Sequence, residues 1–283
     1  MSRPIARIPA RLLPVAIAGI VIAWSIVTLV PIAKAAETPD GIAPASAIAA
    51  APRRPPLAKL PRPGVSGIAG MPPVGGCLIV EGFSREANAS GVRTNGLTGF
   101  FECSVAKRIS LWAQPTHFLL KSGASGWGDI AFGPKVLLNH ESARIPLIAL
   151  GYSYKQPAAT NRMGSGLRDH KVFLFADKIV NQTTRITANF STKWEGWRDT
   201  YVRQYSESLA VATPIHGKLG GAFQTWYATS VLNNCGGAVV AAVYSVRPTL
   251  SVQAGVEHGF GPRSPDFGLI LGANFLYRGR KPR

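Results

Sequence analysis

Histidines are the first residues to consider for catalysis or metal binding, and in this chain they are few and scattered. The five are His117, His140, His170, His216 and His258. No two lie three or four residues apart, so no helix could present a pair of them to one metal ion, and the His-Glu-x-x-His motif is absent. We therefore predict neither a metal site nor a cofactor.

One short run does carry the residue types of a hydrolytic site. Asn139, His140, Glu141 and Ser142 follow one another directly. A catalytic set has to converge in space, which adjacency in the sequence does not establish, and the Gly-x-Ser-x-Gly nucleophile motif is absent. We interpret the run as a turn between two strands and predict that the chain is not an enzyme. A barrel-type lipid hydrolase is the alternative.

The elements that would position such residues begin after an export signal. Three arginines precede an apolar run from Leu12 to Val30, and Ala33-Lys34-Ala35 supplies a small-x-small cleavage site. A positive end, an apolar middle and a cleavage site of this type make a secretory signal peptide. We predict that residues 1–35 are removed on export. The alternative is that the apolar run remains as a single membrane anchor.

Residues 36–75 have the composition of a linker. They contain nine prolines interleaved with alanine, arginine and lysine. Proline removes a backbone donor and holds the chain extended, so this stretch is excluded from a helix or a central strand. We predict a solvated tether that leads into a domain spanning residues 76–283. The basic residues of the tether would also allow contact with the cell wall or with anionic lipid.

From about residue 77 onward the sequence alternates with a period of two. From Thr184 to Trp194, and again from Leu250 to Glu257, mostly apolar side chains occupy one face and polar side chains the other. Side chains alternate across a strand, so these stretches predict β-strands with one apolar face. Similar stretches, separated by turn residues, lie near 97–105, 108–114, 129–138, 146–154, 171–180, 203–212, 218–227, 238–246 and 269–277.

The apolar faces must point either into a soluble core or out to lipid. The polar faces carry charges such as Arg185, Lys193 and Glu257, which a packed soluble core would not accept without partners. Glycines inside the strands suit a closed, curved sheet. Aromatic residues stand at strand ends, where a membrane barrel has interfacial girdles. The residues assigned to these girdles are Trp112, Trp127, Tyr152, Trp194, Trp226 and Tyr277.

Composition agrees with a membrane barrel. Charged residues make up 16% of the chain, against about 25% in an average soluble domain. Only one apolar run is long enough for a membrane helix, which excludes a multi-span helical protein. We therefore predict an all-β fold, namely a transmembrane antiparallel up-and-down β-barrel of about 10 to 12 strands.

Four parts of the barrel sequence, in order, resemble the outer-membrane β-barrels of the meta-pathway phenol degradation family. They are Gly99–Leu111, Gly126–Lys135, Leu209–Trp226 and a closing set made of Tyr244–Leu250, Gly255–Gly259 and Gly268–Gly272. The resemblance covers residues 77–277. It implies an outer-membrane transporter for small molecules that are aromatic or apolar.

The three cysteines are interpreted in the light of export. Three are too few for a four-cysteine zinc module or a disulfide-dense scaffold. In an oxidising compartment Cys77 and Cys103 could pair, and this would fasten the start of the domain to its first long strand. Two buried free thiols are the alternative. Cys235 is expected in a hairpin loop.

The chain is strongly basic, with 31 Lys and Arg against 14 Asp and Glu. These residues are scattered over strands and turns without a recognition element, so nucleic acid is not the expected partner. Either they form a solvated rim that meets lipid phosphates, which is the favoured reading, or they give the lumen a positive potential that favours anions. Candidate lumen-facing residues on the polar faces are Lys135, Lys155, Arg185, Lys193, Arg203 and Glu257.

The predicted function follows from the barrel. We expect an exported protein of the bacterial outer membrane that acts as a channel for passive uptake of small molecules, aromatic or anionic. Its partners would be outer-membrane lipid and the solute. A structural barrel without a channel is the first alternative, and the lipid hydrolase named above is the second.

Overall fold

The computed structural model describes residues 67–278 apart from a few short stretches. The stretches left out are residues 88–92, 122, 162, 182, 198–199, 232–233 and 262–263. The predicted signal peptide (residues 1–35) and the predicted linker as far as residue 66 lie outside the described residues.

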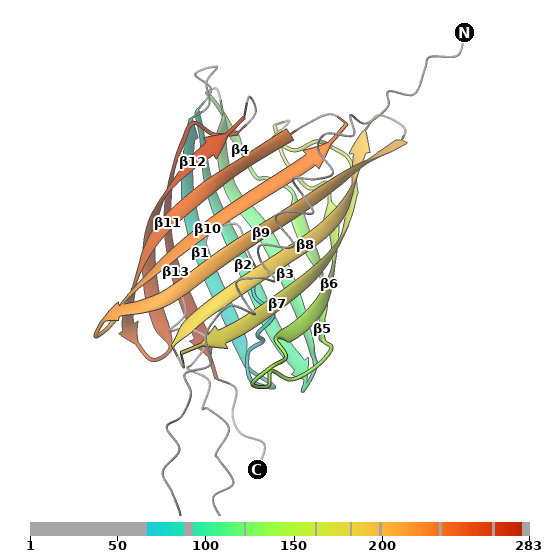
Figure 1. Cartoon of the computed structure of the whole chain (residues 1–283). Helices are drawn as coiled ribbons and strands as arrows, with labels where there is room; N and C mark the ends of the chain where they lie inside the picture. Colours follow the sequence, from blue (N-terminus) through green and yellow to red (C-terminus); the bar gives the residue numbers. More distant parts are fainter. Residues whose placement is uncertain are drawn as a thin grey trace, which may run out of the picture. The chain divides into compact units, whose positions relative to one another are not determined.

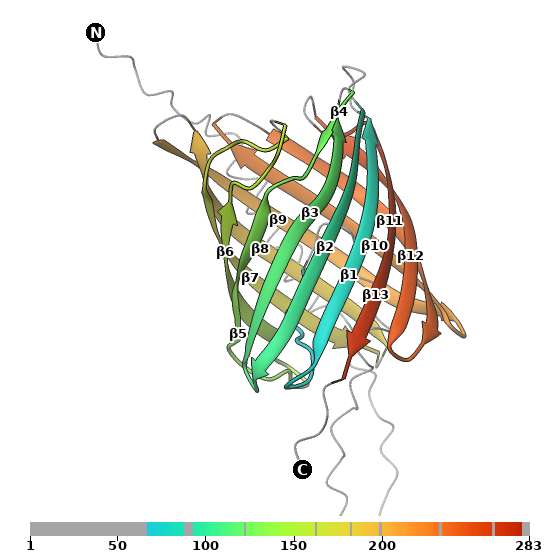
Figure 2. The same cartoon turned by 180° about the vertical axis from the view of Figure 1, so that it is seen from behind.

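The described chain folds into β-strands that follow one another around a closed wall (Figure 1, Figure 2). The strands are β1 (Cys77–Ala87), β2 (Arg93–Ala106), β3 (Ile109–Lys121), β4 (Ala124–Gly126), β5 (Ile130–Leu137), β6 (Leu147–Gln156), β7 (Asp169–Val180), β8 (Thr184–Trp197), β9 (Thr200–His216), β10 (Leu219–Ser230), β11 (Asn234–Arg247), β12 (Leu250–Phe260) and β13 (Phe267–Tyr277).

The pairing is that of an up-and-down barrel. Each long strand pairs antiparallel with the long strands before and after it, and β1 pairs with β13, which closes the barrel. The short β4 only extends the sheet beside the end of β3, so twelve strands form the wall. The predicted transmembrane barrel of about 10 to 12 strands is confirmed. Among the described residues, no helix is long and apolar enough to cross a membrane.

The two faces of the wall differ in chemistry, as a membrane barrel requires. Large apolar side chains point outward, for example Leu111 and Val240, which are 51% and 56% exposed. Polar side chains such as Glu102 and Gln224 point inward and are buried. The apolar face is therefore available to acyl chains, and the polar groups are enclosed.

The connections differ between the two ends of the barrel. Where β1 begins and β13 ends, most turns are short, namely 107–108, 181–183, 217–218 and 248–249. Asn181 and Gly217 take positive φ angles of 48° and 53° there, the left-handed conformation that tight turns need. The opposite end carries the longest connection, residues 157–168. We call these the turn end and the loop end.

A disulfide fastens the first hairpin near the turn end. Cys77 and Cys103 face each other across β1 and β2 and are joined with an S–S distance of 2.10 Å. Cys235 is not disulfide-bonded. It is the second residue of β11, so its expected place in a hairpin loop is corrected.

Candidate functional site

The lumen contains the part of the chain that precedes the first strand. Ile68 and Ala69 are 3% and 0% exposed, and at the turn end the Ser104 hydroxyl donates to the Pro72 carbonyl over 2.7 Å. Prediction from sequence assigned all of residues 36–75 to a solvated linker. The last part of that range instead lies against the inner wall. We call residues 67–72 the luminal segment.

Two charged side chains of the wall hold the backbone of the luminal segment. The Lys135 Nζ donates to the carbonyls of Ile68 (3.1 Å) and Gly70 (3.0 Å). Asp177 Oδ2 accepts from the backbone N–H groups of Ala69 (3.0 Å) and Gly70 (3.3 Å). Buried backbone groups need partners. Here an irregular segment obtains them from one lysine and one aspartate.

These two side chains have charged partners of their own in the wall. Lys135 forms an ion pair with Glu102, whose carboxylate also accepts from the Ser110 hydroxyl (2.8 Å). Asp177 lies 3.6 Å from the guanidinium of Arg185. Each buried charge is thus balanced, which the low dielectric of the lumen demands. The luminal segment and these ion pairs thus lie together inside the barrel near the turn end.

A cavity of about 430 Å³ extends from these ion pairs toward the loop end. Gly67 and Ile68 contribute to its lining, and the side-chain amide of Asn189 donates to the Gly67 carbonyl over 3.2 Å. The luminal segment therefore forms part of the cavity wall on the side of the turn end. A cavity of this size is within the range of sites for small organic molecules, roughly 300–1,000 Å³.

One part of the cavity lining is aromatic. Phe100 and Trp112 stack with ring centroids 6.0 Å apart, and Trp112 lies 5.8 Å from Phe173. Phe173 in turn lies 5.4 Å from Phe175. All four residues line the cavity. They form a continuous row of rings, which we call the aromatic wall.

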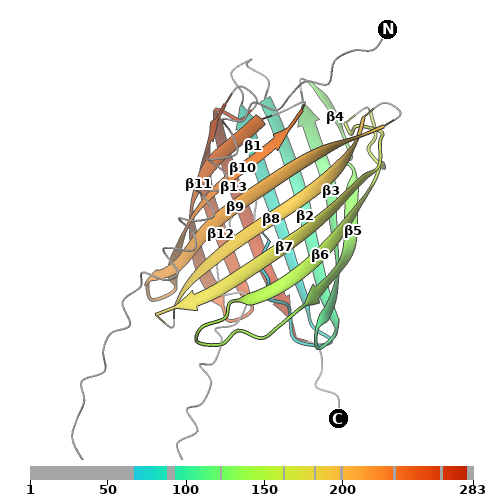
Figure 3. The same ribbon diagram turned by 45° about the vertical axis from the view of Figure 1, so that its right-hand side comes forward.

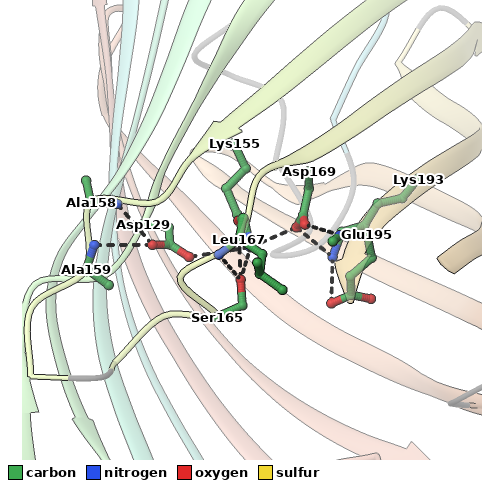
Figure 4. A network of polar contacts seen from close by, with 10 residues as sticks. Asp129, Lys155, Ala158, Ala159, Ser165, Leu167, Asp169, Lys193 and Glu195 are labelled. Atoms are coloured by element: carbon green, nitrogen blue, oxygen red, sulfur yellow. Dashed lines mark hydrogen bonds and ion pairs between the residues drawn. The ribbon is translucent and has the colours of Figure 1, made fainter. Parts of the chain in front are cut away.

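Another part of the lining is a network of charges from β6, β7 and β8, strands that lie side by side (Figure 3). Asp169 contacts Lys155 (2.8 Å) and Lys193 (3.2 Å), as Figure 4 shows. Lys155 also reaches Asp129 (3.4 Å), and Lys193 reaches Glu195 (3.2 Å). The carboxylate of Asp129 accepts from backbone N–H groups of the 157–168 connection, so the network also orders the loop end.

Most of the predicted lumen-facing residues lie on the inner face. Lys135, Lys155 and Lys193 line the cavity, and Arg185 is buried beside the luminal segment. Glu257 is 5% exposed and accepts from the indole N–H of Trp226 over 2.8 Å.

Arg203 is the exception, and its assignment to the lumen is wrong. It is exposed on the outer face of β9, with its guanidinium 5.9 Å from the ring centroid of Trp194. It also donates to the hydroxyl of Tyr205 over 3.2 Å, and Tyr205 is itself 50% exposed. An arginine among aromatic residues near the loop end suits an interface, where its charge can reach water.

The predicted aromatic girdle divides in the same way. Trp127, Tyr152 and Tyr277 are exposed, and Trp194 lies on the outer face with Arg203. Trp112 and Trp226 were wrongly assigned to the girdle, because both point inward and line the cavity. A ring at a strand end looks the same in the sequence whichever face it occupies.

Sequence reasoning missed several of the most important lumen residues on β7. Asp169, Lys171, Phe173, Phe175 and Asp177 occupy alternate positions and all face inward. The signal was weak because the positions between them include Val172 and Leu174. The inward face has charged residues toward both ends of the strand and two phenylalanines in its middle, so the sequence does not show it as a polar face.

The residues of the Asn139–Ser142 run contact different parts of the chain: His140 lies beside the guanidinium of Arg108, and the Ser142 hydroxyl accepts from the Ile145 N–H. They lie in the connection between β5 and β6. There the Asn139 side-chain amide donates to the Pro146 carbonyl and its oxygen accepts from the Ile148 N–H. The Glu141 carboxylate accepts from the backbone N–H of Ile179. This is the hydrogen bonding of an ordered turn. Within the described ranges, no three His, Cys, Asp or Glu residues are grouped to hold a metal ion.

No family model matches the sequence, and no curated protein matches it. Solved structures match in fold. An outer membrane channel from Pseudomonas putida F1 superposes with a TM-score of 0.58 at 13% identity, over 75% of this chain and 99% of that one. The NanC porin gives 0.52 at 9% identity and the KdgM porin 0.50 at 11%, each over 70% of this chain and 98% of the porin. The chain thus has the fold of a porin-like transmembrane β-barrel.

Proposed function

We propose that this chain is an outer-membrane channel for the passive uptake of small molecules that are aromatic or anionic. The observation that carries the proposal is the cavity of about 430 Å³ enclosed by a barrel with an apolar outer face. The fold likeness to an outer membrane channel and to porins supports it. The resemblance to the meta-pathway phenol degradation family supports the finer assignment to aromatic solutes.

The orientation follows from the connections. Short turns face the periplasm in barrels of this kind, and longer loops face outward. The turn end, where β1 begins and β13 ends, would then be periplasmic, and the cavity would receive solute from the loop end. Export through the predicted signal peptide, and contact of the linker with the cell wall, belong to the same proposal.

The luminal segment gives the channel a closed state. The Lys135–Glu102 and Asp177–Arg185 pairs hold it inside the barrel, and in this proposal it lies across the path from the cavity to the turn end. Passage of solute would require the segment to leave these partners. The same observation favours the second candidate, a structural barrel without a channel, because a segment that never leaves these partners would keep solutes from crossing the lumen.

Swelling of liposomes that contain the purified chain tests the proposal. A variant that carries Lys135→Met, Glu102→Gln, Asp177→Asn and Arg185→Gln loses both ion pairs with no change in net charge. We expect benzoate and arabinose to enter faster through this variant than through the wild type, because the luminal segment is held less tightly. The control is Lys178→Gln, on the outer face of β7, the strand that carries Asp177. It should leave the rate of solute entry unchanged. No swelling with either the wild type or the fourfold variant would favour the structural barrel.

A further inference from the structure

The cavity holds more positive than negative charge. Four lysines line it, namely Lys135, Lys155, Lys171 and Lys193. Three carboxylates line it, namely Glu102, Asp169 and Glu207, and the first two pair with three of these lysines. Among the described residues, no carboxylate forms an ion pair with Lys171. This lysine is therefore the cation of the cavity that a solute anion could reach without displacing a protein partner.

Lys171 also stands directly beside the aromatic wall. Its Nζ lies 5.2 Å from the ring centroid of Phe173, two positions along β7 and on the same inner face. From Phe173 the aromatic wall continues through Trp112 to Phe100. Lys171 and the aromatic wall thus lie next to each other in the same cavity, and a single small molecule could contact both.

A solute that uses both features must itself have two parts. An uncharged aromatic molecule would bury the ammonium of Lys171 without a counter-ion, which is costly in an enclosed site. A small anion without a ring would leave the aromatic wall facing water. A planar ring that bears a carboxylate gains ring–ring contact and a charge-assisted hydrogen bond together.

We propose that the cavity is a binding site for monoaromatic carboxylates, with the ring against Phe100, Trp112 and Phe173 and the carboxylate on Lys171. The assignment rests on the proposed channel function in that the bound molecule would be the transported solute. It narrows that function from aromatic or anionic solutes to molecules that are both.

Calorimetric titration of the full chain in detergent tests the site with three probes. Benzoate has the ring and the charge, benzyl alcohol has only the ring, and cyclohexanecarboxylate has the charge on a saturated ring. We expect benzoate to bind about tenfold more tightly than either of the others, since each lacks one of the two contacts. Equal affinity for benzoate and benzyl alcohol, or for benzoate and cyclohexanecarboxylate, would overturn the proposal without any variant.

Variants then assign the two contacts. Lys171→Gln should weaken the binding of benzoate about tenfold and leave the affinity for benzyl alcohol unchanged. Lys171→Arg should retain the affinity for benzoate. Lys178→Gln, on the outer face of the same strand, is the matched control. Phe173→Leu should weaken benzoate and benzyl alcohol, and Phe190→Leu on the outer face should not. Benzoate binding that is the same in the Lys171→Gln and Lys178→Gln variants, with both shown to be folded by a heat-dependent gel shift, would refute the site.

The titration tests the binding site and the swelling measurement tests the channel, so one proposal can be wrong while the other holds. Benzoate binding without swelling would contradict the channel and keep the site. Swelling without any preference for benzoate would contradict the site and keep the channel.

Discussion

Two pairs of charged side chains near the turn end balance each other, and each pair also binds the luminal segment. Lys135 balances Glu102 and binds two carbonyls of the luminal segment. Asp177 balances Arg185 and binds two backbone N–H groups of the same segment. Because an unpartnered charge is expensive in a buried site, the members of a pair depend on each other more than the barrel depends on the pair.

Single and double substitutions at the first pair should therefore differ. We expect Lys135→Met to lower the free energy of unfolding by about 3–5 kcal/mol, because it leaves the Glu102 carboxylate buried without its lysine. Lys135→Met combined with Glu102→Gln should cost clearly less, since no bare charge remains. Urea unfolding in detergent, followed by tryptophan fluorescence, measures both. A double variant that is as unstable as the single one would contradict this account.

At the scale of elements, the approach of β5 to β6 depends on one glycine. A Cβ at Gly133 would overlap the backbone carbonyl of Tyr152. The next residue, Pro134, has no N–H to donate, and the regular pairing of β5 with β6 skips Gly133 and Pro134. The wall therefore closes here through close backbone contact rather than through a continuous ladder.

We expect Gly133→Ala to destabilise the barrel by about 1–3 kcal/mol, the usual cost of overpacking. Gly82→Ala is the matched control, because a Cβ at Gly82 would meet its nearest atom at an ordinary 3.7 Å. The temperature at which the folded, fast-migrating form is lost on a gel measures the difference. Equal temperatures for the two variants would show that β5 can move away from β6 at little cost.

For the molecule as a whole, the decisive property is that the outer face meets lipid. Val240 and Val246 lie on the outer face of β11, at 56% and 38% exposure. Val240 is in the middle of the strand, and Val246 is one residue from its end at Arg247. Lipid is most hostile to charge at the centre of the bilayer, so depth should decide the cost of an arginine.

Val240→Arg should lower the free energy of unfolding in lipid vesicles by about 2–4 kcal/mol, and Val246→Arg by about 0–1 kcal/mol. Denaturant titration of the two variants in the same vesicles makes the comparison. If both arginines cost the same, the face around Val240 does not lie at the centre of a bilayer, and the membrane assignment loses its main support.

Much of the barrel could be predicted from sequence because strand alternation is local. The φ and ψ angles of a strand send neighbouring side chains to opposite faces, so the pattern from Thr184 to Trp194 identified β8 before any contact was known. Charges on one face and apolar residues on the other then made the membrane orientation the economical choice. The wrong assignment of Arg203 shows the limit, because its neighbours on both faces of β9 include polar residues.

The contents of the lumen could not be predicted, because they depend on closure of the barrel. Gly67–Gly70 has no pattern of its own, and its partners are remote, with Asp177 lying 108 residues from Ala69 and Lys135 lying 65 residues from Gly70. Trp112 and Trp226 looked like interfacial residues until the wall turned them inward. The amino-acid sequence alone determined a barrel with an apolar exterior, since that rests on short-range alternation. Only the tertiary structure decided which charges and rings share the enclosed space, since that depends on contacts across the closed sheet.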